Sequence, residues 1–594
     1  MERLKTTYFR LSGETGKLCR NISDRWLKDI AETNPAILSM FADRDVRPYR
    51  DLLAWSGEFA GKYLTGACFV WRMTGDRALK RYVSGFIDRL LAYQDEDGYL
   101  GCYSRETRFT GALPQTPETR PWTWDCWAHY HIAFGLLLWY DETGKKAYFR
   151  AAERIAGLLM RTFYRGKPAI SSTGSAEMNL AVYHLFAGLY NRTGEEKYLQ
   201  FALETERDMA ADGAGNWLEW AAGGNRFCDC PKPRWESLHI VMGFAEMYRA
   251  TGRKKYLDAL ETTVRSILET DVHNTGGFST REQAVGNPYE NGVIETCCVV
   301  AFDALVLELW KLTGETALLD FLEFAHYNAA MGAVSPSGAW ATYDTPMEGE
   351  RFANFHGCDF QSRPGSPMLN CCSVNFPRGV AEMSEWAASE DERGIYINTF
   401  ESGRFVWENG EVTISGNYPF GGRIKIACRA PGEKRGIFVR IPGWSKRTVL
   451  RTEGRENVLP PGGYAPLPGK GTAEAELELD FSVRMLPGGG AYEGKVSLCK
   501  GPLLLAFDLA DNPALAEKNG GTGFTAAERL AEMQVPELPL SELAEAEFVV
   551  KEGGRGELKL KSGPVLTDFY HAGETGGLYK TWFSVKAPAH IKND

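Results

Sequence analysis

The sequence predicts an α+β multidomain fold, an (α/α)6 barrel followed by an antiparallel β-sandwich. At 594 residues the chain is too long for one compact core, so several domains are expected. A Thr-Gly pair recurs between apolar helical segments from residue 74 to residue 314. From about residue 390, short segments rich in β-branched residues alternate apolar and polar positions between Gly/Pro turns. The first pattern is typical of helical hairpins and the second of paired strands.

The Thr-Gly pairs divide the N-terminal region into helical hairpins. They are Thr74-Gly75, Thr143-Gly144, Thr193-Gly194, Thr251-Gly252 and Thr313-Gly314. Each glycine follows an amphipathic segment, where a left-handed C-cap favours glycine, and another helix follows closely. The predicted helices span residues 25–41, 52–74, 77–94, 124–142, 145–163, 176–192, 196–210, 235–250, 253–270, 293–312, 315–332 and 374–388. Twelve helices in six pairs predict a barrel, because one hairpin alone cannot bury its apolar face.

The remaining connections between the predicted helices are long. They span residues 95–123, 164–175, 211–234, 271–292 and 333–373. If the Thr-Gly turns share one end of the barrel, these long connections share the other end. Long loops on one face of a rigid scaffold usually carry the binding groups, so we expect the functional site at that end.

The C-terminal region has the pattern of a β-sandwich. Its clearest predicted strands are residues 394–400, 404–407, 423–428, 436–440 and 475–480. Residues 511–545 are rich in Ala and Glu and predict an insertion with a helix, whereas residues 558–585 are strand-like again. The predicted domains are therefore the barrel at 1–388, the sandwich at 389–510, and a C-terminal segment at 511–594 that is partly an insertion and partly returning strands of the sandwich.

The composition argues against several function classes. A net charge of −10 offers no basic field for a phosphate backbone, so nucleic acid is not an expected partner. No apolar run is long enough to span a bilayer, and the N-terminus lacks the apolar core of a signal peptide, so no membrane association is expected. The cysteines cluster in close pairs, which suit metal or reactive thiol sites in a reducing cytosol. We expect a cytoplasmic protein, with a homodimer left open beside a monomer.

The pattern Glu295-Thr-Cys297, taken with Cys371-Cys372, is the most distinctive in the chain. Glu295 and Cys297 stand at the start of an apolar run, so both side chains can reach the N-terminal end of that helix. The vicinal cysteines arrive on a later loop of the same expected face. Three thiolates and a carboxylate suit four-coordinate zinc, since sulfur ligands select Zn²⁺ over Mg²⁺ or Ca²⁺. The alternative is that these cysteines are ordinary buried residues, because no CxxC knuckle is present.

Other side chains on the long-loop face would suit a glycosidase. They include Trp124, Asp125, Trp127, His129, His131, Trp217, Trp220, Trp235, His239, Glu282, Glu323, Tyr327 and Tyr343. A glycosidase needs an acid/base, a nucleophile, hydroxyl-binding groups and stacking platforms around one pit. Each residue also has an ordinary explanation, since inward Trp and His often fill a core and Glu282 could be a solvated loop acid. Cys228 and Cys230 have no evident partner pair and are expected to pack or stay free.

In their order along the chain, these motifs resemble glycoside hydrolase family 127, the β-L-arabinofuranosidases. The residues that carry the resemblance are Gly276-Gly277-Phe278, Glu282, Glu295-Thr-Cys297, Glu323, Tyr327-Asn328, Tyr343, Cys371-Cys372, Asn375 and Arg378. It continues at residues 439–444, Gly462-Gly-Tyr464 and Gly501-Pro502, and so covers nearly the whole chain. The Glu-Thr-Cys and Cys-Cys elements together are highly specific.

The resemblance implies a zinc-dependent retaining exo-glycosidase. It implies zinc held by Glu295, Cys297, Cys371 and Cys372, with Cys371 as the nucleophile and Glu282 as the general acid/base. It also implies sugar-hydroxyl contacts at His131, His239, Glu323 and Tyr343. Zinc keeps a thiol ionised near neutral pH, so a thiolate can attack the anomeric carbon while a carboxyl group protonates the leaving oxygen. The same carboxylate then deprotonates the water that releases the sugar, which gives net retention.

The expected substrate is an oligosaccharide or glycoside that ends in a β-L-arabinofuranosyl or closely related sugar. Ser175 stands where the family usually has a sugar-contacting His, and such a change shifts sugar selectivity before it shifts mechanism. The same site acting on a different pentoside or a pectin-derived sugar is therefore one alternative. A non-catalytic carbohydrate-binding protein is the other, because four permanent protein ligands are typical of structural zinc sites.

Overall fold

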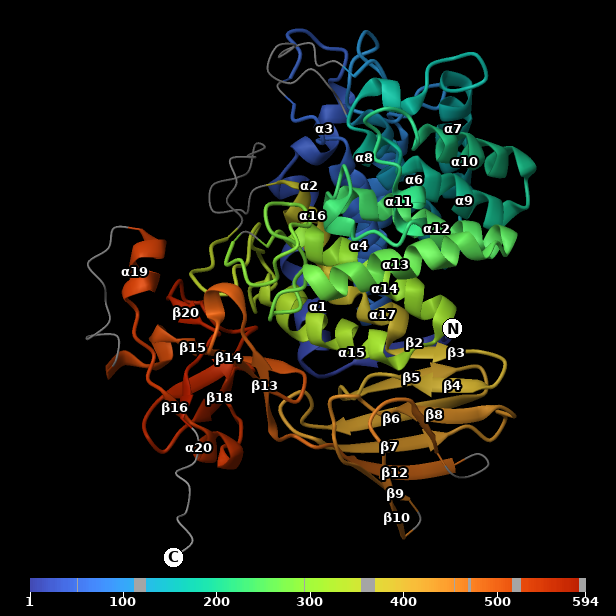
Figure 1. Cartoon of the computed structure of the whole chain (residues 1–594). Helices are drawn as coiled ribbons and strands as arrows, with labels where there is room; N and C mark the ends of the chain where they lie inside the picture. Colours follow the sequence, from blue (N-terminus) through green and yellow to red (C-terminus); the bar gives the residue numbers. More distant parts are fainter. Residues whose placement is uncertain are drawn as a thin grey trace, which may run out of the picture.

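The chain folds into a helical N-terminal region and a sheet-rich C-terminal region (Figure 1). This order of regions agrees with the sequence prediction. The computed structural model describes residues 1–50, 52–111, 124–292, 294–353, 369–452, 454–467, 472–514 and 525–586. None of the helices within these ranges combines the length and the apolar character needed to cross a bilayer.

The five predicted Thr-Gly turns are confirmed. Each glycine is the C-cap of a helix and adopts the left-handed conformation, with φ between 62° and 69°. The N–H of Gly75, for example, donates to the carbonyl of Trp71 (2.7 Å). The hydroxyl of Thr74 donates to the carbonyl of Val70 (2.8 Å). Each turn therefore ends one helix sharply and lets the next helix fold back beside it.

Six helices of the described chain form a closed ring. They are α4 (Glu58–Thr74), α6 (Asp125–Thr143), α9 (Val182–Thr193), α12 (Leu238–Thr251), α14 (Thr296–Thr313) and α16 (Cys371–Ala381). Each packs on the next in this order, and α16 packs back on α4. A Thr-Gly turn follows each of the first five, so the C-termini of these helices share one end of the ring. Their N-termini share the other end, where the long connections gather as predicted.

A second layer of helices covers the ring. It consists of α5 (Arg77–Leu91), α7 (Lys146–Thr162), α10 (Glu196–Asp208), α13 (Lys254–Thr270) and α15 (Thr316–Ala325). Each packs on the ring helix that precedes it in the chain, as α7 does on α6 and α10 on α9. An earlier helix, α1 (Glu14–Ile22), packs on both α4 and α16. Shorter helices lie at Ala176–Asn179 (α8), Trp217–Ala222 (α11) and Met383–Trp386 (α17).

The first predicted helix, at residues 25–41, is broken in the structure. Helix α1 begins before it, and the segment itself contains a π-helical turn and two short helices. These are Ser23–Leu27, Ile30–Thr33 (α2) and Ala36–Ala42 (α3). Pro35 explains the break before α3, because the residue that precedes a proline is disfavoured in the helical conformation.

Two glycines let α4 and α6 approach each other closely. A Cβ atom on Gly61 would lie 2.3 Å from the carbonyl carbon of His131, and one on Gly135 would lie 2.7 Å from the Cβ atom of Leu64. Neither position has room for a larger side chain. The close approach brings the buried face of α4 beside that of α6 inside the ring.

Two sheets follow the ring and take up the first strands of the chain. The strands are β1 (Glu2–Arg3), β2 (Thr6–Leu11), β3 (Ala388–Glu390), β4 (Gly394–Ile397), β5 (Gly403–Trp407), β6 (Gly410–Gly416), β7 (Arg423–Arg429), β8 (Gly436–Arg440), β9 (Thr448–Thr452), β10 (Arg455–Leu459), β11 (Tyr464–Pro466) and β12 (Thr472–Glu478). Their orders are β1-β3-β4-β8-β11 and β10-β9-β12-β7-β6-β5-β2. Neighbours are antiparallel except β4 and β8. Strands β1 and β2 lie in the segment that the sequence analysis assigned to the barrel, and they pair with β3 and β5.

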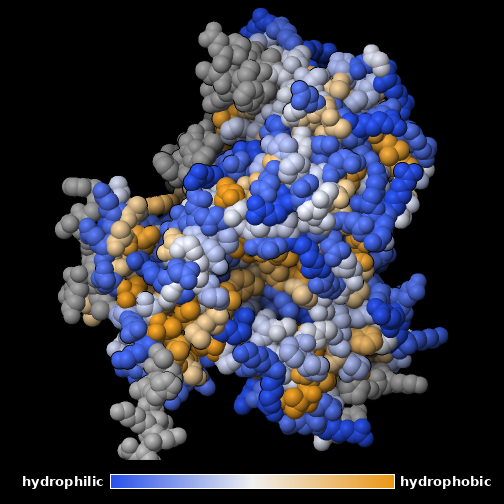
Figure 2. Space-filling model, in the orientation of Figure 1, coloured by the Kyte–Doolittle hydropathy of each residue, from blue (hydrophilic) through white to orange (hydrophobic). Residues whose placement is uncertain are grey.

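A third sheet is built from the rest of the chain. Its strands are β13 (Val483–Pro487), β14 (Val496–Lys500), β15 (Leu503–Asp508), β17 (Val549–Val550), β18 (Gly556–Lys559), β19 (Val565–Asp568) and β20 (Tyr579–Lys580). Helices α19 (Ala526–Glu532) and α20 (Leu540–Glu545) and the parallel pair β16 (Leu538–Pro539) and β21 (Val585–Lys586) lie between or after these strands. Polar residues cover most of the visible face of the helical region, whereas hydrophobic patches gather over this sheet (Figure 2). The exposed Met485, Val549 and Val550 belong to it.

Arg440 joins β8 to helix α15 across the boundary between helices and sheets. Its side chain is fully buried, and its guanidinium lies 2.6 Å from the carboxylate of Asp320 and 2.6 Å from that of Glu323. Its Nε also donates to the carbonyl of Asn398 (3.0 Å). Such a buried pair stabilises the fold only while every partner stays in place.

We expect Arg440→Leu to lower the free energy of unfolding by about 3–5 kcal/mol, because the buried carboxylate of Glu323 and the half-buried one of Asp320 would lose their cation. Chemical denaturation followed by circular dichroism measures this loss. Arg451→Leu is the control, since Arg451 also pairs with carboxylates, Glu456 and Glu478, but on an exposed sheet face. Arg451→Leu should lower the free energy of unfolding clearly less than Arg440→Leu does. Equal losses in the two variants would argue against a special role for Arg440.

Candidate active site

Four side chains that the sequence analysis predicted as metal ligands form one buried cluster. Glu295, Cys297, Cys371 and Cys372 each offer a ligand atom, and these atoms lie within 4.8 Å of one another. The Cys372 sulfur lies 3.3 Å from Glu295 Oε1 and 3.6 Å from the Cys297 sulfur. The Cys371 sulfur lies 3.6 Å from Glu295 Oε1 and 3.8 Å from the Cys372 sulfur. The cluster could hold a metal ion, and its three thiols with one carboxyl group match the donors that zinc prefers.

All four residues of this cluster lie at the N-termini of two ring helices, α14 and α16. Glu295 is the N-cap residue of α14, and Cys297 is the second residue of that helix. Cys371 and Cys372 are the first two residues of α16. The N-terminus of a helix carries a partial positive charge, which favours carboxylate and thiolate groups there. The ring therefore supplies an environment for negative charge before any ion is bound.

Helix α16 begins earlier than the sequence predicts. A helix was expected at residues 374–388, with the paired cysteines on the loop before it, whereas α16 starts at Cys371. A capping box explains this start. The Asn370 side chain accepts from the N–H of Ser373 (3.0 Å), and the Ser373 hydroxyl accepts from the N–H of Asn370 (2.9 Å). The cap fixes both cysteines on the rigid first turn of a helix.

The ionisable groups of the cluster influence one another strongly. Burial raises the pKa of Glu295 and of Cys372. Although burial also raises the pKa of Cys297, hydrogen bonds from Cys371 and Cys372 and the charge of Lys62 bring it below its ordinary value. The hydrogen bond with Cys297 raises the pKa of Cys371. The neighbouring thiols and Lys62 therefore favour the thiolate form of Cys297, and a bound metal ion would favour the ionised form of every ligand.

Glu282 lies on a constrained loop beside the cluster. Ser279, Arg281 and Glu282 all have positive φ values, of 82°, 58° and 62°. Residues other than glycine rarely adopt this conformation. The N–H of Trp235 donates to the Glu282 carbonyl (3.4 Å) and helps to hold the turn. Backbone strain of this kind persists only where the surrounding structure fixes it, and it is common at functional sites.

Tyr343 links Glu282 to Cys371. Its hydroxyl donates to Glu282 Oε1 (3.1 Å) and lies 3.7 Å from the Cys371 sulfur. The other carboxylate oxygen of Glu282 accepts from Arg234 (2.9 Å). Arg234 also pairs with the buried carboxylate of Glu236 (2.7 Å). Both carboxylate oxygens of Glu282 therefore accept a hydrogen bond. The Tyr343 hydroxyl lies between this carboxylate and the Cys371 thiol and contacts both.

These groups line a cavity of about 330 Å³. Its aromatic side chains are Trp55, Trp124, Trp235 and Tyr343, and its carboxyl groups are Glu58, Glu177, Glu236, Glu282 and Glu295. Cys371 lines the cavity, whereas Cys297 and Cys372 lie fully buried behind it. Aromatic faces combined with a few polar groups are typical of a pocket for a polar, ring-shaped ligand.

Comparison with protein families matches this chain twice. The model for the β-L-arabinofuranosidase GH127 catalytic domain matches residues 46–385, and the model for the GH127 middle domain matches residues 394–483. The chain belongs to glycoside hydrolase family 127. The resemblance drawn from the sequence motifs is confirmed, and so is the assignment as a glycoside hydrolase. A comparison with curated proteins gave no match.

Solved structures share the fold of this family 127 hydrolase over nearly its whole length. A protein described as a GH127 β-arabinofuranosidase has 17% identity and a TM-score of 0.76, with 99% of each chain covered. A GH127 β-L-arabinofuranosidase from Geobacillus stearothermophilus T6 has 16% identity and a TM-score of 0.73, with 98% of this chain and 100% of that chain covered. A protein described as a glycoside hydrolase has 18% identity and a TM-score of 0.69, with 98% and 96% covered.

In this family 127 hydrolase, His131 and His239 are not among the described residues that line the cavity. Both are buried, and their rings contact Trp127 at centroid distances of 4.3 Å and 4.9 Å. The Nδ1 atom of His239 shares a hydrogen bond with the Tyr130 hydroxyl (2.8 Å). The Nε2 atom of His131 has no hydrogen-bond partner among the described residues. Both histidines are near the site, and their predicted contact with the sugar stays a prediction.

Glu323 does not line the cavity, and the prediction of a sugar contact there needs correction. Its carboxylate pairs with Arg440 (2.6 Å) and accepts from the Trp444 indole N–H (3.1 Å). The physical reason is that α15 belongs to the outer layer, so Glu323 faces the sheets. Tyr343, by contrast, lines the cavity as expected.

Sequence reasoning missed a buried ion pair beside the cluster. Lys62 Nζ lies 2.9 Å from Glu58 and 3.8 Å from the Cys297 sulfur. Burial raises the pKa of Glu58 to about 7 despite its lysine partner. Burial lowers the pKa of Lys62, but the charges of Cys297 and Glu58 raise it above its ordinary value. The sequence did contain a signal for this pair. Glu58 and Lys62 lie four residues apart on a largely apolar helix, and Lys and Glu are seldom buried unless they are paired.

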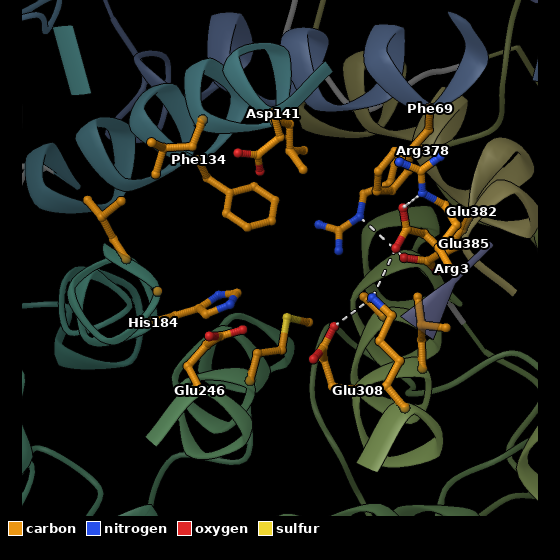
Figure 3. Close-up of a pocket in the computed structure, with 18 of the residues that line it drawn as sticks. Arg3, Phe69, Phe134, Asp141, His184, Glu246, Glu308, Arg378, Glu382 and Glu385 are labelled. Atoms are coloured by element: carbon orange, nitrogen blue, oxygen red, sulfur yellow. Dashed lines mark hydrogen bonds and ion pairs between the residues drawn. The ribbon is translucent and has the colours of Figure 1, made fainter. Parts of the chain in front are cut away.

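A second cavity, of about 290 Å³, lies near the C-terminal end of the ring. Charged side chains from several ring helices surround it (Figure 3). These charges pair with one another: Arg192 with Asp141 (2.9 Å), Lys311 with Glu308 (3.2 Å) and Arg378 with Glu382 (3.5 Å). The described residues that line it include no thiol. The first cavity, which holds Cys371 and Glu282, is therefore the candidate active site.

Proposed function

We propose that the protein is a retaining exo-glycosidase that releases a terminal β-L-arabinofuranosyl or closely related sugar. The observation that carries this proposal is the meeting of the Cys371 thiol and the Glu282 carboxyl group at the Tyr343 hydroxyl, in the wall of one cavity. A nucleophile and an acid/base on one cavity are the two groups that a retaining mechanism requires. Cys371 would serve as the nucleophile and Glu282 as the acid/base.

We propose zinc as the metal of the cluster. The ligands would be Glu295, Cys297, Cys371 and Cys372, whose donor atoms already lie close together. Bound zinc would keep the Cys371 thiol ionised near neutral pH. The helix N-termini under Glu295 and Cys371 support the same ionised state.

The proposed reaction has two displacement steps. In the first, the Cys371 sulfur forms a bond to the anomeric carbon while the bond from that carbon to the leaving oxygen breaks, and Glu282 gives its proton to this oxygen. In the second, a water oxygen bonds to the anomeric carbon, the carbon–sulfur bond breaks, and Glu282 accepts the proton of the water. Two inversions give net retention. Tyr343 and Arg234 would orient the Glu282 carboxyl group throughout.

The proposal of a β-L-arabinofuranosyl sugar is based on membership of family 127. The matching family models carry the name β-L-arabinofuranosidase. A cavity of about 330 Å³ is near the lower end of the range for ligand pockets, which supports one terminal sugar as the occupant. Ser175 and Glu177 lie in its wall, so they would influence which sugar fits.

We also interpret the ring of helices as the inner layer of an (α/α)6 barrel, and the first two sheets as a β-sandwich. Contacts from α4 through α16 and back to α4 support the barrel. Strand β7 supports the sandwich, because its residues alternate between exposed and buried along the strand.

A panel of aryl glycosides tests the proposed function. We expect kcat/KM for an aryl β-L-arabinofuranoside to exceed that for its α-anomer and for pyranosides by at least about tenfold, since the wall groups discriminate between sugars. Metal analysis of the same sample should give zinc at a ratio near one per chain. If another glycoside were hydrolysed faster, only the proposed substrate would change, and the proposed mechanism would stand. Zinc-loaded, folded protein without activity on any glycoside would contradict the proposed chemistry.

A further inference from the structure

Two nitrogen donors converge on one thiol of the cluster. Lys62 Nζ lies 3.8 Å from the Cys297 sulfur, and the Asn375 amide donates to the same sulfur (3.4 Å). Lys62 comes from α4, Cys297 from α14 and Asn375 from α16, so three ring helices meet at this atom. Within the described part of the chain, Lys62 is the cation that reaches a sulfur of the cluster at hydrogen-bonding distance.

The ammonium group of Lys62 is fixed in position. Its side chain is 2% exposed, and Glu58 holds its Nζ at 2.9 Å. The Nζ atom also lies 4.8 Å from the ring centre of Trp235 and 5.7 Å from that of Trp127. Indole faces attract a cation and exclude water, so the charge of Lys62 acts on its neighbours with little screening.

Cys371 has different surroundings from Cys297. Its sulfur contacts the Tyr343 hydroxyl and Glu295, and among the described residues no lysine or amide nitrogen donates to it. Cys371 is 5% exposed and lines the cavity, whereas Cys297 is 0% exposed. Hydrogen bonds to a ligand sulfur withdraw electron density from it and fix its orientation. The cluster therefore contains one sulfur that is held by donors and one that faces the substrate cavity.

We propose that Lys62 is a positioning residue that, together with Asn375, fixes Cys297 as a permanent metal ligand and leaves Cys371 as the reactive thiol. Three thiolates and a carboxylate around a divalent cation would leave a buried excess of negative charge, which the cation of Lys62 partly offsets. This inference rests on the proposed function, because it takes the cluster as a zinc site.

Zinc affinity gives a test that does not depend on turnover. The wild type and Lys62→Met compete with a chromophoric chelator for zinc. We expect Lys62→Met to bind zinc about 10- to 100-fold more weakly, the usual loss when an outer-shell partner of a ligand is removed. Lys62→Arg keeps the charge and should recover part of that affinity.

Two further variants separate this role from a general loss of stability. Lys311→Met is the matched control, since Lys311 is also held by carboxylates, Glu308 (3.2 Å) and Glu385 (3.0 Å), but at the far cavity. Its zinc affinity should stay within about twofold of the wild type. The double variant Glu58→Gln/Lys62→Met removes both members of the buried ion pair, so no lone carboxylate is left at position 58. It should therefore recover thermal stability while its zinc affinity stays low.

The zinc affinities of the wild type and the variants test the role of Lys62 separately from the proposed metal site. Wild-type protein that binds no zinc would overturn the proposed metal site. Wild-type protein that binds zinc tightly, with folded Lys62→Met of equal affinity, would overturn the role of Lys62 alone. Recovery of zinc affinity in the double variant would also count against it, because the affinity would then follow stability rather than the charge beside Cys297.

Discussion

Replacing Cys371 with serine is expected to lower kcat by at least about 10³-fold, because an alcohol near neutral pH is a far weaker nucleophile than the zinc-bound thiolate that we propose. The expectation follows from position: Cys371 lines the cavity, and its sulfur lies 3.7 Å from the hydroxyl that also holds Glu282. Steady-state kinetics with an aryl β-L-arabinofuranoside measures the loss. In the wild type, rapid acid quench and peptide mass analysis should find one sugar unit attached to the peptide that contains Cys371.

Two control variants distinguish loss of the nucleophile from loss of the metal. Cys372→Ser removes another donor of the cluster, but this residue is fully buried and does not line the cavity. Added zinc should therefore restore part of the activity of Cys372→Ser and none of that of Cys371→Ser. Cys228→Ser, which changes a half-buried thiol on another loop, should behave like the wild type. Full turnover in Cys371→Ser, or a sugar adduct on a different residue, would show that the nucleophile is assigned wrongly.

Glu282→Gln should lower kcat/KM by about 10²- to 10⁴-fold for substrates with a poor leaving group, because the leaving oxygen would lose its proton donor. A substrate with a good leaving group needs little protonation, so its first step should be nearly unchanged. Release of the sugar should then become slow, since no base activates the water. A burst of aryl alcohol followed by a slow steady rate would reveal this change.

Azide provides a direct check of the base role of Glu282. Azide needs no deprotonation, so it should restore turnover in Glu282→Gln and give a glycosyl azide of retained configuration. Glu290→Gln is the matched control, because Glu290 lies on the same loop but pairs with the exposed Arg281. Its kinetics should match those of the wild type. An unaffected Glu282→Gln, or one that azide fails to rescue, would assign the acid/base to another group.

The sequence was informative wherever a signal is local along the chain. The Thr-Gly pairs predicted left-handed C-caps, and glycines such as Gly75 and Gly144 adopt them. This agreement is expected because a C-cap is set by the few residues around it. The limits of helices that depend on tertiary packing or side-chain capping were less predictable. The start of α16 at Cys371, set by the Asn370–Ser373 capping box, is one example.

Residue type and spacing likewise identified the thiol–carboxylate cluster, whose donor atoms prove to be close. Residue type and spacing could not predict which way the Glu323 side chain points. A carboxylate on a helix can face either the cavity or the sheets, and only packing decides which. Arg440 lies more than a hundred positions away in the chain, and its buried guanidinium draws Glu323 to the sheets.

The sequence by itself therefore determined the helical hairpins, the strand-rich region, the family and the four residues of the thiol–carboxylate cluster, because each depends on short-range patterns or motif order. Only the tertiary structure decided which residues surround those donors. Lys62 meets Cys297 because closure of the ring brings α4 beside α16 and toward α14. Spacing along the chain contains no such information, since the energy that selects these neighbours comes from burying all six inner helix faces together.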